Sequence, residues 1–193
     1  ENNIDFKVVG DQTLFEITGW NLYFIHTRRL GAIPDKCAPT NETLKGECNN
    51  SLIDSSDIDL ALRYTQKSQK NEFGFFSAFE ANSLYSSGRD YFAGRYRRNI
   101  SELKGSVGYM LTAVDRPSIS REAYVHTIDF DFKPSKPTRV YGWLSQSNIK
   151  NGPNDIDGTG ARVVVTRGFS DQLFVLGALN YLDEDFDIND MGY

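Results

Sequence analysis

From Trp20 onward the sequence divides into segments of about ten residues separated by short polar stretches, and this spacing restricts the fold more than any other feature. Apolar and polar residues alternate within most segments, as in β-strands, whose successive side chains point to opposite faces. The segments also match the roughly 9–11 residues of a tilted strand that crosses a membrane. We predict strands at 20–29, 57–66, 72–82, 91–99, 103–114, 123–133, 138–147, 160–168 and 172–182.

The alternation predicts one apolar and one charged face. In 123–133, for example, Tyr124 and Ile128 alternate with Thr127 and Asp129. If the strands close into a barrel, the polar side chains line its lumen, where we expect most charges to pair across the wall rather than form an open polar path. The candidates for this polar face are Arg28, Asp59, Arg63, Glu80, Arg95, Arg97, Asp129, Asp131 and Arg162.

The connections between the predicted strands alternate in length. The short ones lie at 67–71, 100–102, 134–137 and 169–171, and the long ones at 30–56, 83–90, 115–122 and 148–159. Short turns at one end and longer loops at the other are typical of transmembrane β-barrels. We therefore predict an all-β fold, an antiparallel up-and-down transmembrane barrel whose strands occupy 20–193 after a lead-in at 1–19, and we expect the barrel to be incomplete in this chain.

Composition and charge agree with a strand-built protein. Aromatic residues make up 13% of the chain and glycine contributes 16 residues, a mixture that suits strands better than helices. No apolar run reaches the roughly 20 residues of a membrane helix, so a membrane span would consist of strands. The net charge of −5, with scattered Lys and Arg, disfavours nucleic acid as a partner.

The two cysteines, Cys37 and Cys48, both lie in the polar stretch 30–56. A C-x10-C pair within one loop favours a disulfide and an oxidising compartment, with two free thiols as the alternative. A metal site is disfavoured because no histidine lies near either cysteine.

A soluble antiparallel sheet would produce the same alternation, with its apolar face toward a core. In that alternative the chain is an all-β carbohydrate-binding module of sandwich or jelly-roll type, which presents Trp20, Tyr141 and Trp143 to sugars. Aromatic residues near strand ends favour the membrane interpretation, because barrels carry girdles of them at both interfaces. These residues are Trp20, Tyr64, Tyr85, Tyr91, Tyr124 and Tyr181.

Two passages resemble a known family. LYFIHTRRLG, with Arg28, Arg29 and Gly31, is similar to an aromatic strand that ends in Ser-Arg-Arg-Ile-Gly, although the preceding LFEITG departs from the family's pattern. DEDFDINDMGY is similar to an acidic approach to Asn-Asp-Leu-Gly-Phe, here at Asn189, Asp190, Gly192 and Tyr193. The family comprises Gram-negative envelope proteins that join a family-nine carbohydrate-binding-like domain to a C-terminal β-barrel domain of unknown function. The resemblance implies that 1–193 is the first part of such a barrel, with more strands after Tyr193 and a periplasmic domain before Glu1.

Candidate chemistry in the sequence is sparse. His26 and His126 each stand alone on a predicted strand, and no hydrolase or phosphate-loop motif appears. We therefore expect no enzymatic activity and no cofactor. Asp183, Asp185 and Asp187 alternate like the start of a Ca²⁺ loop, but the turn glycine and closing glutamate are missing, and a solvated acidic loop is the interpretation we favour. The same holds for Asp155 and Asp157.

The expected function is that of a non-enzymatic channel, receptor or anchor in the outer membrane of a Gram-negative bacterium. Outer-membrane lipid is the expected partner. Through the domain that the resemblance implies, oligosaccharide binding or uptake is a second expectation.

Overall fold

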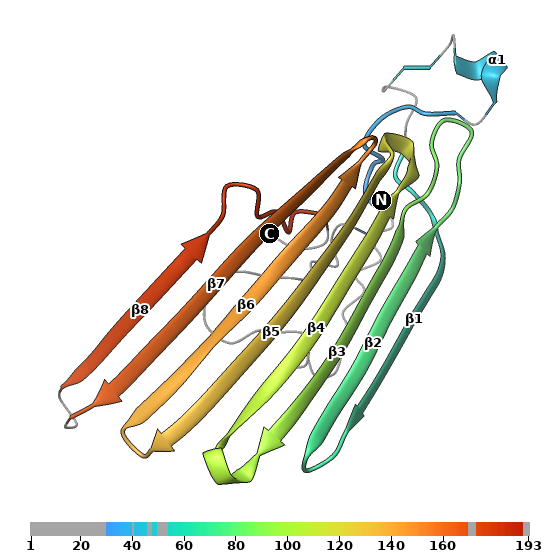
Figure 1. The fold of residues 1–193 in the computed structure, drawn as a ribbon. Helices are drawn as coiled ribbons and strands as arrows, with labels where there is room; N and C mark the ends of the chain where they lie inside the picture. Colours follow the sequence, from blue (N-terminus) through green and yellow to red (C-terminus); the bar gives the residue numbers. More distant parts are fainter. Residues whose placement is uncertain (1–29, 40, 46–47, 50–53, 170–172, 191–193) are drawn as a thin grey trace.

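A computed structural model describes residues 30–39, 41–45, 48–49, 54–169 and 173–190. Eight strands form one antiparallel sheet in the order β1-β2-β3-β4-β5-β6-β7-β8, so each strand pairs with its neighbours in sequence (Figure 1). The described sheet is not closed: β1 and β8 are its two edges. The strands are β1 (Ile58–Lys67), β2 (Asn71–Glu80), β3 (Asp90–Ile100), β4 (Gly105–Arg116), β5 (Arg121–Ser135), β6 (Thr138–Asn151), β7 (Asn154–Gly168) and β8 (Phe174–Leu182).

The predicted all-β, antiparallel, up-and-down architecture is confirmed at this level. Each predicted strand from 57–66 onward corresponds to one observed strand, with ends that differ by up to six residues. The predicted strand 20–29, the lead-in 1–19 and the polar-face candidate Arg28 lie outside the described residues. The one described α-helix, α1 (Glu42–Lys45), belongs to the stretch before β1.

The predicted long loop at 148–159 is wrong. β6 and β7 continue through this stretch and meet in a two-residue turn, Gly152–Pro153, with Asn151 paired to Asn154. Gly152 takes the positive φ that such a hairpin needs at its first turn residue, and the Asn148 side chain donates to Asp157 across the strands. The polar composition that resembles a loop therefore belongs to strand ends with polar residues on both faces.

The loop predicted at 115–122 is also shorter than expected. β4 extends to Arg116 and β5 begins at Arg121, with a 3-10 turn at Pro117–Ile119 between them. Of the connections between described strands, the one between Glu80 and Asp90 is the longest. The alternation of short and long loops is therefore not present, and it lends no support to a membrane topology.

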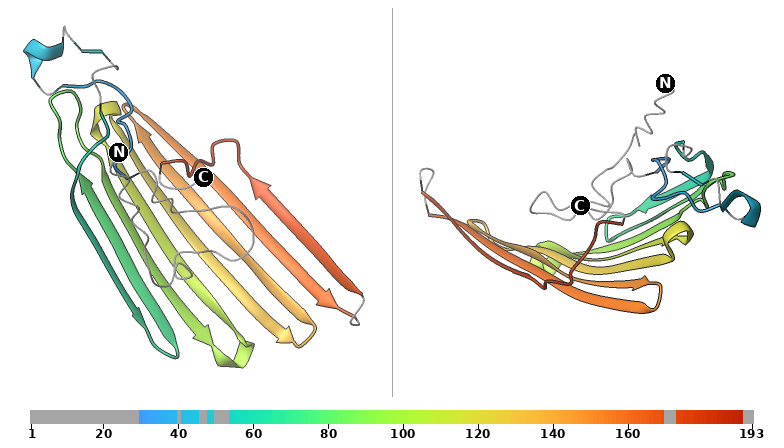
Figure 2. Two further views of the ribbon diagram at one scale, coloured as in Figure 1. Left: turned by 180° about the vertical axis from the view of Figure 1, so that it is seen from behind. Right: turned by 90° about the horizontal axis from the view of Figure 1, so that it is seen from above.

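The sheet is curved, and the C-terminal segment lies on its concave side (Figure 2). Residues 30–38 reach the same end of the sheet as the loop before β3, because the Ala38 N–H donates to the Tyr85 carbonyl. The predicted disulfide is confirmed: Cys37 and Cys48 are bonded, with their Cα atoms 5.8 Å apart.

Candidate functional site: the polar concave face

The two faces of the sheet have the reverse of the polarity expected in water, where a sheet buries its apolar face and exposes its polar face. The buried face carries charged and hydroxyl side chains as well as small and apolar ones. Arg95 is 1% exposed, Thr127 1% and Glu80 6%. Charged groups are seldom buried unless they are paired, so the pairing of these groups decides whether the face is stable.

The opposite, convex face exposes large apolar side chains instead. Leu144 is 53% exposed and Ile128 50%, although both lie in the middle of long central strands. Tyrosines are interspersed among these aliphatic side chains. The outward residues that are exposed in this way are Leu60, Leu62, Tyr64, Phe73, Phe79, Phe92, Tyr96, Tyr109, Tyr124, Ile128, Leu144, Val163, Val165, Val175, Leu179 and Tyr181.

Polar residues border this apolar area at the end of the sheet where residues 30–38 lie. There the strand register aligns outward-facing Asp90, Asp115, Glu122, Lys150 and Asp155 in one row. The exposed face is therefore an apolar band with a charged border at this end.

One row of the concave face crosses all eight strands and carries alternating charge. The register aligns, from β1 to β8, Lys67, Glu72, Arg97, Gly108, Asp129, Trp143, Arg162 and Asn180. Glu72 lies between Lys67, at 3.6 Å, and Arg97, which donates to it. At the far end Arg162 donates to Asn180 at 2.8 Å. We call these eight residues the transverse row.

Gly108 leaves room for an ion pair that bridges a strand next to this row. Arg95, on β3, reaches over β4 to Asp129, on β5, and makes two hydrogen bonds with its carboxylate, one of them 2.9 Å long. A Cβ atom on Gly108 would lie 2.5 Å from Oδ2 of Asp129 and 2.9 Å from Nη2 of Arg95. Any larger residue at this position would force the ends of the Arg95 and Asp129 side chains to move, so glycine leaves room for the charged pair to bridge the strand.

Further ion pairs lie at the two ends of the concave face. Glu80 receives two hydrogen bonds from the Arg89 guanidinium, at 2.7 and 3.0 Å, and a third from the Gly31 N–H. Arg139 holds Asp131 with two hydrogen bonds, at 2.8 and 2.6 Å. Two-point contacts of this kind fix both side chains in position.

A segment after β8 folds back across the concave face. This segment, residues 183–190, is called the inner strap here. Phe186 stacks on Trp143 with ring centroids 6.2 Å apart, and Ile188 packs with Met110 and Val125. The strap packs directly against Gly158 and Gly160 of β7, which we call its seat, since a Cβ on Gly158 would lie 2.3 Å from the strap backbone.

An ion-pair cluster fastens the end of the inner strap. Asp190 accepts hydrogen bonds from Arg116, the last residue of β4, and from Arg121, the first of β5. Arg121 also binds Asp187, and Arg116 also binds Asp35 of the segment before β1. Burial of Asp190 alone would raise its pKa, but the hydrogen bonds from Arg121 and Arg116 outweigh this and lower the pKa. We call Arg116, Arg121 and Asp190 the strap clamp.

Most of the predicted polar-face residues lie on the concave side. Glu80, Arg95, Arg97, Asp129, Asp131 and Arg162 all do so, at the positions described above. Arg63 is aligned with Phe76 on the same side, whereas Asp59 is exposed at the irregular step between Ile58 and Leu60.

Other candidates from the sequence are placed differently from what we expected. Trp143 is 6% exposed under Phe186, so its ring is not open to a sugar, and the Arg139 guanidinium lies 4.8 Å from the centre of the Tyr141 ring. Tyr91, expected in an interfacial girdle, is 3% exposed and faces inward. His126 is exposed and lies 2.7 Å from the Tyr109 hydroxyl.

The acidic residues considered for Ca²⁺ do not converge. Asp187 is bound to Arg121, and Asp183 caps a local turn by accepting from the Asp185 N–H. Asp155 and Asp157 belong to β7. Among the described residues there is no cluster of three or more His, Cys, Asp or Glu side chains that could hold a metal ion.

Sequence reasoning missed the strap clamp and Gly108. Arg116 and Arg121 flank a turn, and Asp190 lies about seventy residues away, so no local pattern connects them. The resemblance did single out Asp190. Gly108 had no signal except its place on the inward side of a predicted strand.

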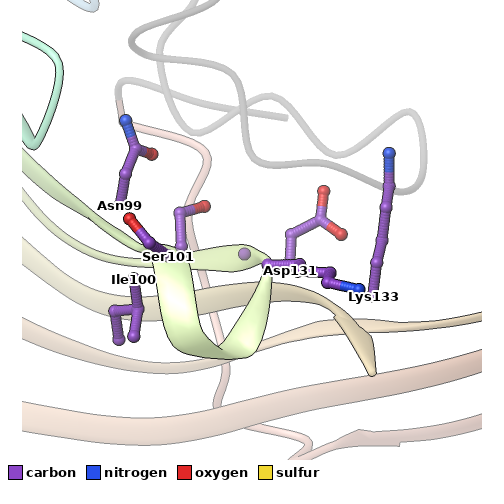
Figure 3. Close-up of a pocket in the computed structure, with 8 residues that line it drawn as sticks. Asn99, Ile100, Ser101, Asp131 and Lys133 are labelled. Carbon is purple, nitrogen blue, oxygen red and sulfur yellow. The ribbon is translucent and has the colours of Figure 1, made fainter. Parts of the chain in front are cut away.

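A shallow depression of about 350 Å³ lies at the other end of the sheet, near the turn between β3 and β4 (Figure 3). Asn99, Asp131 and Lys133 rise on one side of the sheet there, while Ile100 points the other way. The depression is lined mostly by polar and charged residues, and one of them, Asp131, already accepts a hydrogen bond from Arg139.

Comparisons with protein-family models, with curated proteins and with solved structures find no match to this chain. In the part of the chain that the structure describes, no helix is long and apolar enough to span a membrane.

Proposed function

We propose that this chain forms the first part of an outer-membrane β-barrel that serves as a non-enzymatic channel, receptor or anchor in a Gram-negative cell envelope. In this proposal the convex apolar face contacts lipid and the concave polar face lines the interior. The resemblance to envelope proteins with an upstream carbohydrate-binding-like domain favours oligosaccharide as the molecule that is bound or passed.

The observation that carries the proposal is the inverted polarity of the sheet. In water, a sheet buries its apolar face and exposes its polar face. Here Arg95, Asp129 and Thr127 are buried, while Ile128 and Leu144 beside them are about half exposed. An apolar surface spread over all eight strands exceeds the isolated patches of ordinary soluble monomers, and it matches a lipid environment.

The size of the apolar band supports the same proposal. On β5 the outward residues from Tyr124 to Phe132 are apolar except for His126. At about 3.3 Å per residue these eight steps extend roughly 26 Å along the strand. With a strand tilt of about 40° the band is roughly 20 Å tall, close to the ~25 Å band of outer-membrane barrels.

The test is extraction of the protein from cell envelopes, followed by circular dichroism. We expect release by detergent alone, and retention of the strand spectrum in micelles and after insertion into liposomes. A protein that is monodisperse and folded in plain buffer would contradict the proposal and favour the soluble carbohydrate-binding module.

A further inference from the structure

The inner strap is attached to the sheet differently from a strand. Two of its backbone N–H groups donate to the sheet, from Asp183 to the Thr159 carbonyl at 2.9 Å and from Asp187 to the Ser147 hydroxyl at 3.2 Å. Other donors close local turns, as Phe186 does with Asp183. Segments with few hydrogen bonds to the rest of a protein open at lower free energy than its strands do.

The side-chain contacts of the strap are concentrated at two points. The first is apolar: Phe186 stacks on Trp143 over Gly160 of β7, and Ile188 packs beside it with Met110 and Val125. The second is the strap clamp. The Asp190 carboxylate is only 5% exposed, whereas Arg116 and Arg121 are 18% and 15% exposed. The clamp therefore sits where a buried carboxylate meets two guanidinium groups that water can partly reach.

The strap also lies across the concave side of the sheet, where it would obstruct passage through a barrel. Its contacts run from Gly158 on β7, over Ser147 on β6, to Arg121 on β5 and Arg116 on β4. It crosses β4, β5, β6 and β7 on the concave side, where the C-terminal segment lies in Figure 2. At Arg116 it meets Asp35 of the segment before β1, so two chain segments converge at one end of the interior.

We propose that the inner strap is a releasable gate over the concave interior and that the strap clamp keeps it closed. This inference rests on the proposed function, because a gate requires an interior that solutes can enter. Loss of the clamp releases residues 183–190 from Arg116 and Arg121, while the strands, held by their own ladders, remain folded.

The experiment combines hydrogen exchange with conductance, on the full protein in detergent and in planar bilayers. Asp190→Asn keeps the size of the side chain and removes its charge. We expect amides of 183–190 to exchange about tenfold faster than in the wild type, since a charge-assisted pair at the clamp is lost. Amides of β4 to β7 should be unchanged, and the open-channel conductance or open fraction should rise.

Asp155→Asn is the matched control, because Asp155 is an exposed aspartate of β7 on the opposite face. It should alter neither measurement. Gly158→Val is a second, independent variant that displaces the strap from its seat and should reproduce the effect of Asp190→Asn.

Three outcomes would overturn the gate. Unchanged exchange in 183–190 would show that the clamp does not hold the strap, and faster exchange throughout β4 and β5 would make the strap part of the wall. Faster strap exchange with unchanged conductance would show that the strap does not gate. Failure of the wild-type protein to insert into bilayers would instead contradict the proposed membrane function, so the two failures are distinguishable.

Discussion

Gly108 and Asp190 show how single residues determine the chemistry of the concave face. Gly108 leaves room for Arg95 to reach Asp129 across a strand, and Asp190 joins two arginines that flank a turn. In both cases buried charge is tolerated because each carboxylate has a guanidinium partner.

Gly108→Ala should destabilise the sheet by about 1–3 kcal/mol, because the new Cβ forces the ends of the Arg95 and Asp129 side chains to move and weakens their hydrogen bonds. Gly94→Ala is the control, since its Cβ would meet only the Phe92 ring, at 3.4 Å. Denaturant unfolding in micelles provides the measurement. Equal stability of the two variants would argue against the bridging role.

Arg95→Leu alone should cost about 3–5 kcal/mol, because it leaves Asp129 buried without its main partner. Combining it with Asp129→Leu should recover much of this loss, since no uncompensated charge remains. A double-mutant cycle on unfolding free energies measures the coupling. Additive losses would indicate that the two groups do not depend on each other.

The lowered pKa of Asp190 predicts an acid limit for the strap. A carboxylate with a folded pKa below its unfolded value of about 4 contributes stability at higher pH and loses it as the pH falls through the folded pKa. The fluorescence of Trp143, measured in a Trp20→Phe background, should therefore change below about pH 4, because the Phe186 ring no longer stacks on the Trp143 ring. Asp190→Asn should lack most of this transition, and an unchanged transition would show that the Asp190 carboxylate is not what holds the strap.

At the scale of single strands, apolar side chains face outward and polar side chains face inward within the same stretch of sequence. β5 alternates exposed Tyr124 and Ile128 with buried Thr127 and Asp129. β8 departs from this rule, because its inward side carries Phe174 and other apolar residues and all of its positions are exposed. An edge strand of this kind is open to further pairing.

Ile128→Arg separates the membrane and soluble interpretations at this scale. In a bilayer the substitution should cost about 2–4 kcal/mol, whereas an exposed residue of a soluble sheet should tolerate it within about 0.5 kcal/mol. Gln146→Arg, on the same face but aligned with His126 nearer the border of the apolar band, should cost less than Ile128→Arg in a bilayer and little in a soluble sheet. The comparison uses folding into liposomes, and equal costs for both variants would contradict a lipid-facing Ile128.

At the scale of the whole molecule, the disulfide-bonded stretch and the loop before β3 share one end of the sheet (Figure 1). The turn at Gly152–Pro153 lies at this end, and the turn between β5 and β6 lies at the other. A membrane barrel would place the two ends in different compartments.

Thiol labelling of whole cells tests this arrangement. In a background of Cys37→Ser and Cys48→Ser, one of the two variants Pro153→Cys and Lys136→Cys, which lie at opposite ends of the sheet, should react with a reagent that cannot cross the outer membrane, and the other should not. The native pair, after mild reduction, should behave like Pro153→Cys. Equal labelling of both ends in intact cells would contradict a membrane-spanning arrangement.

Local side-chain chemistry was sufficient to predict the described strands and, where apolar and polar residues alternate, their faces. Alternation in 123–133 assigned Ile128 and Asp129 to opposite sides because the geometry of a strand leaves no other choice. The Cys37–Cys48 bond was predictable because its partners lie close in sequence within one loop. Loop lengths were not, because Asn148 to Asp157 has the composition of a loop yet pairs as two strands across a tight turn.

The inner strap and the contacts that hold it depended on tertiary structure. Arg95 reaches Asp129 over the space that Gly108 leaves open, and Asp190 reaches Arg116 only because the chain after β8 turns back over the sheet. Which charges meet therefore depends on strand register and on the path of a segment without strand pairing. Periodicity determines which way each side chain points, and only the assembled sheet determines what it meets there.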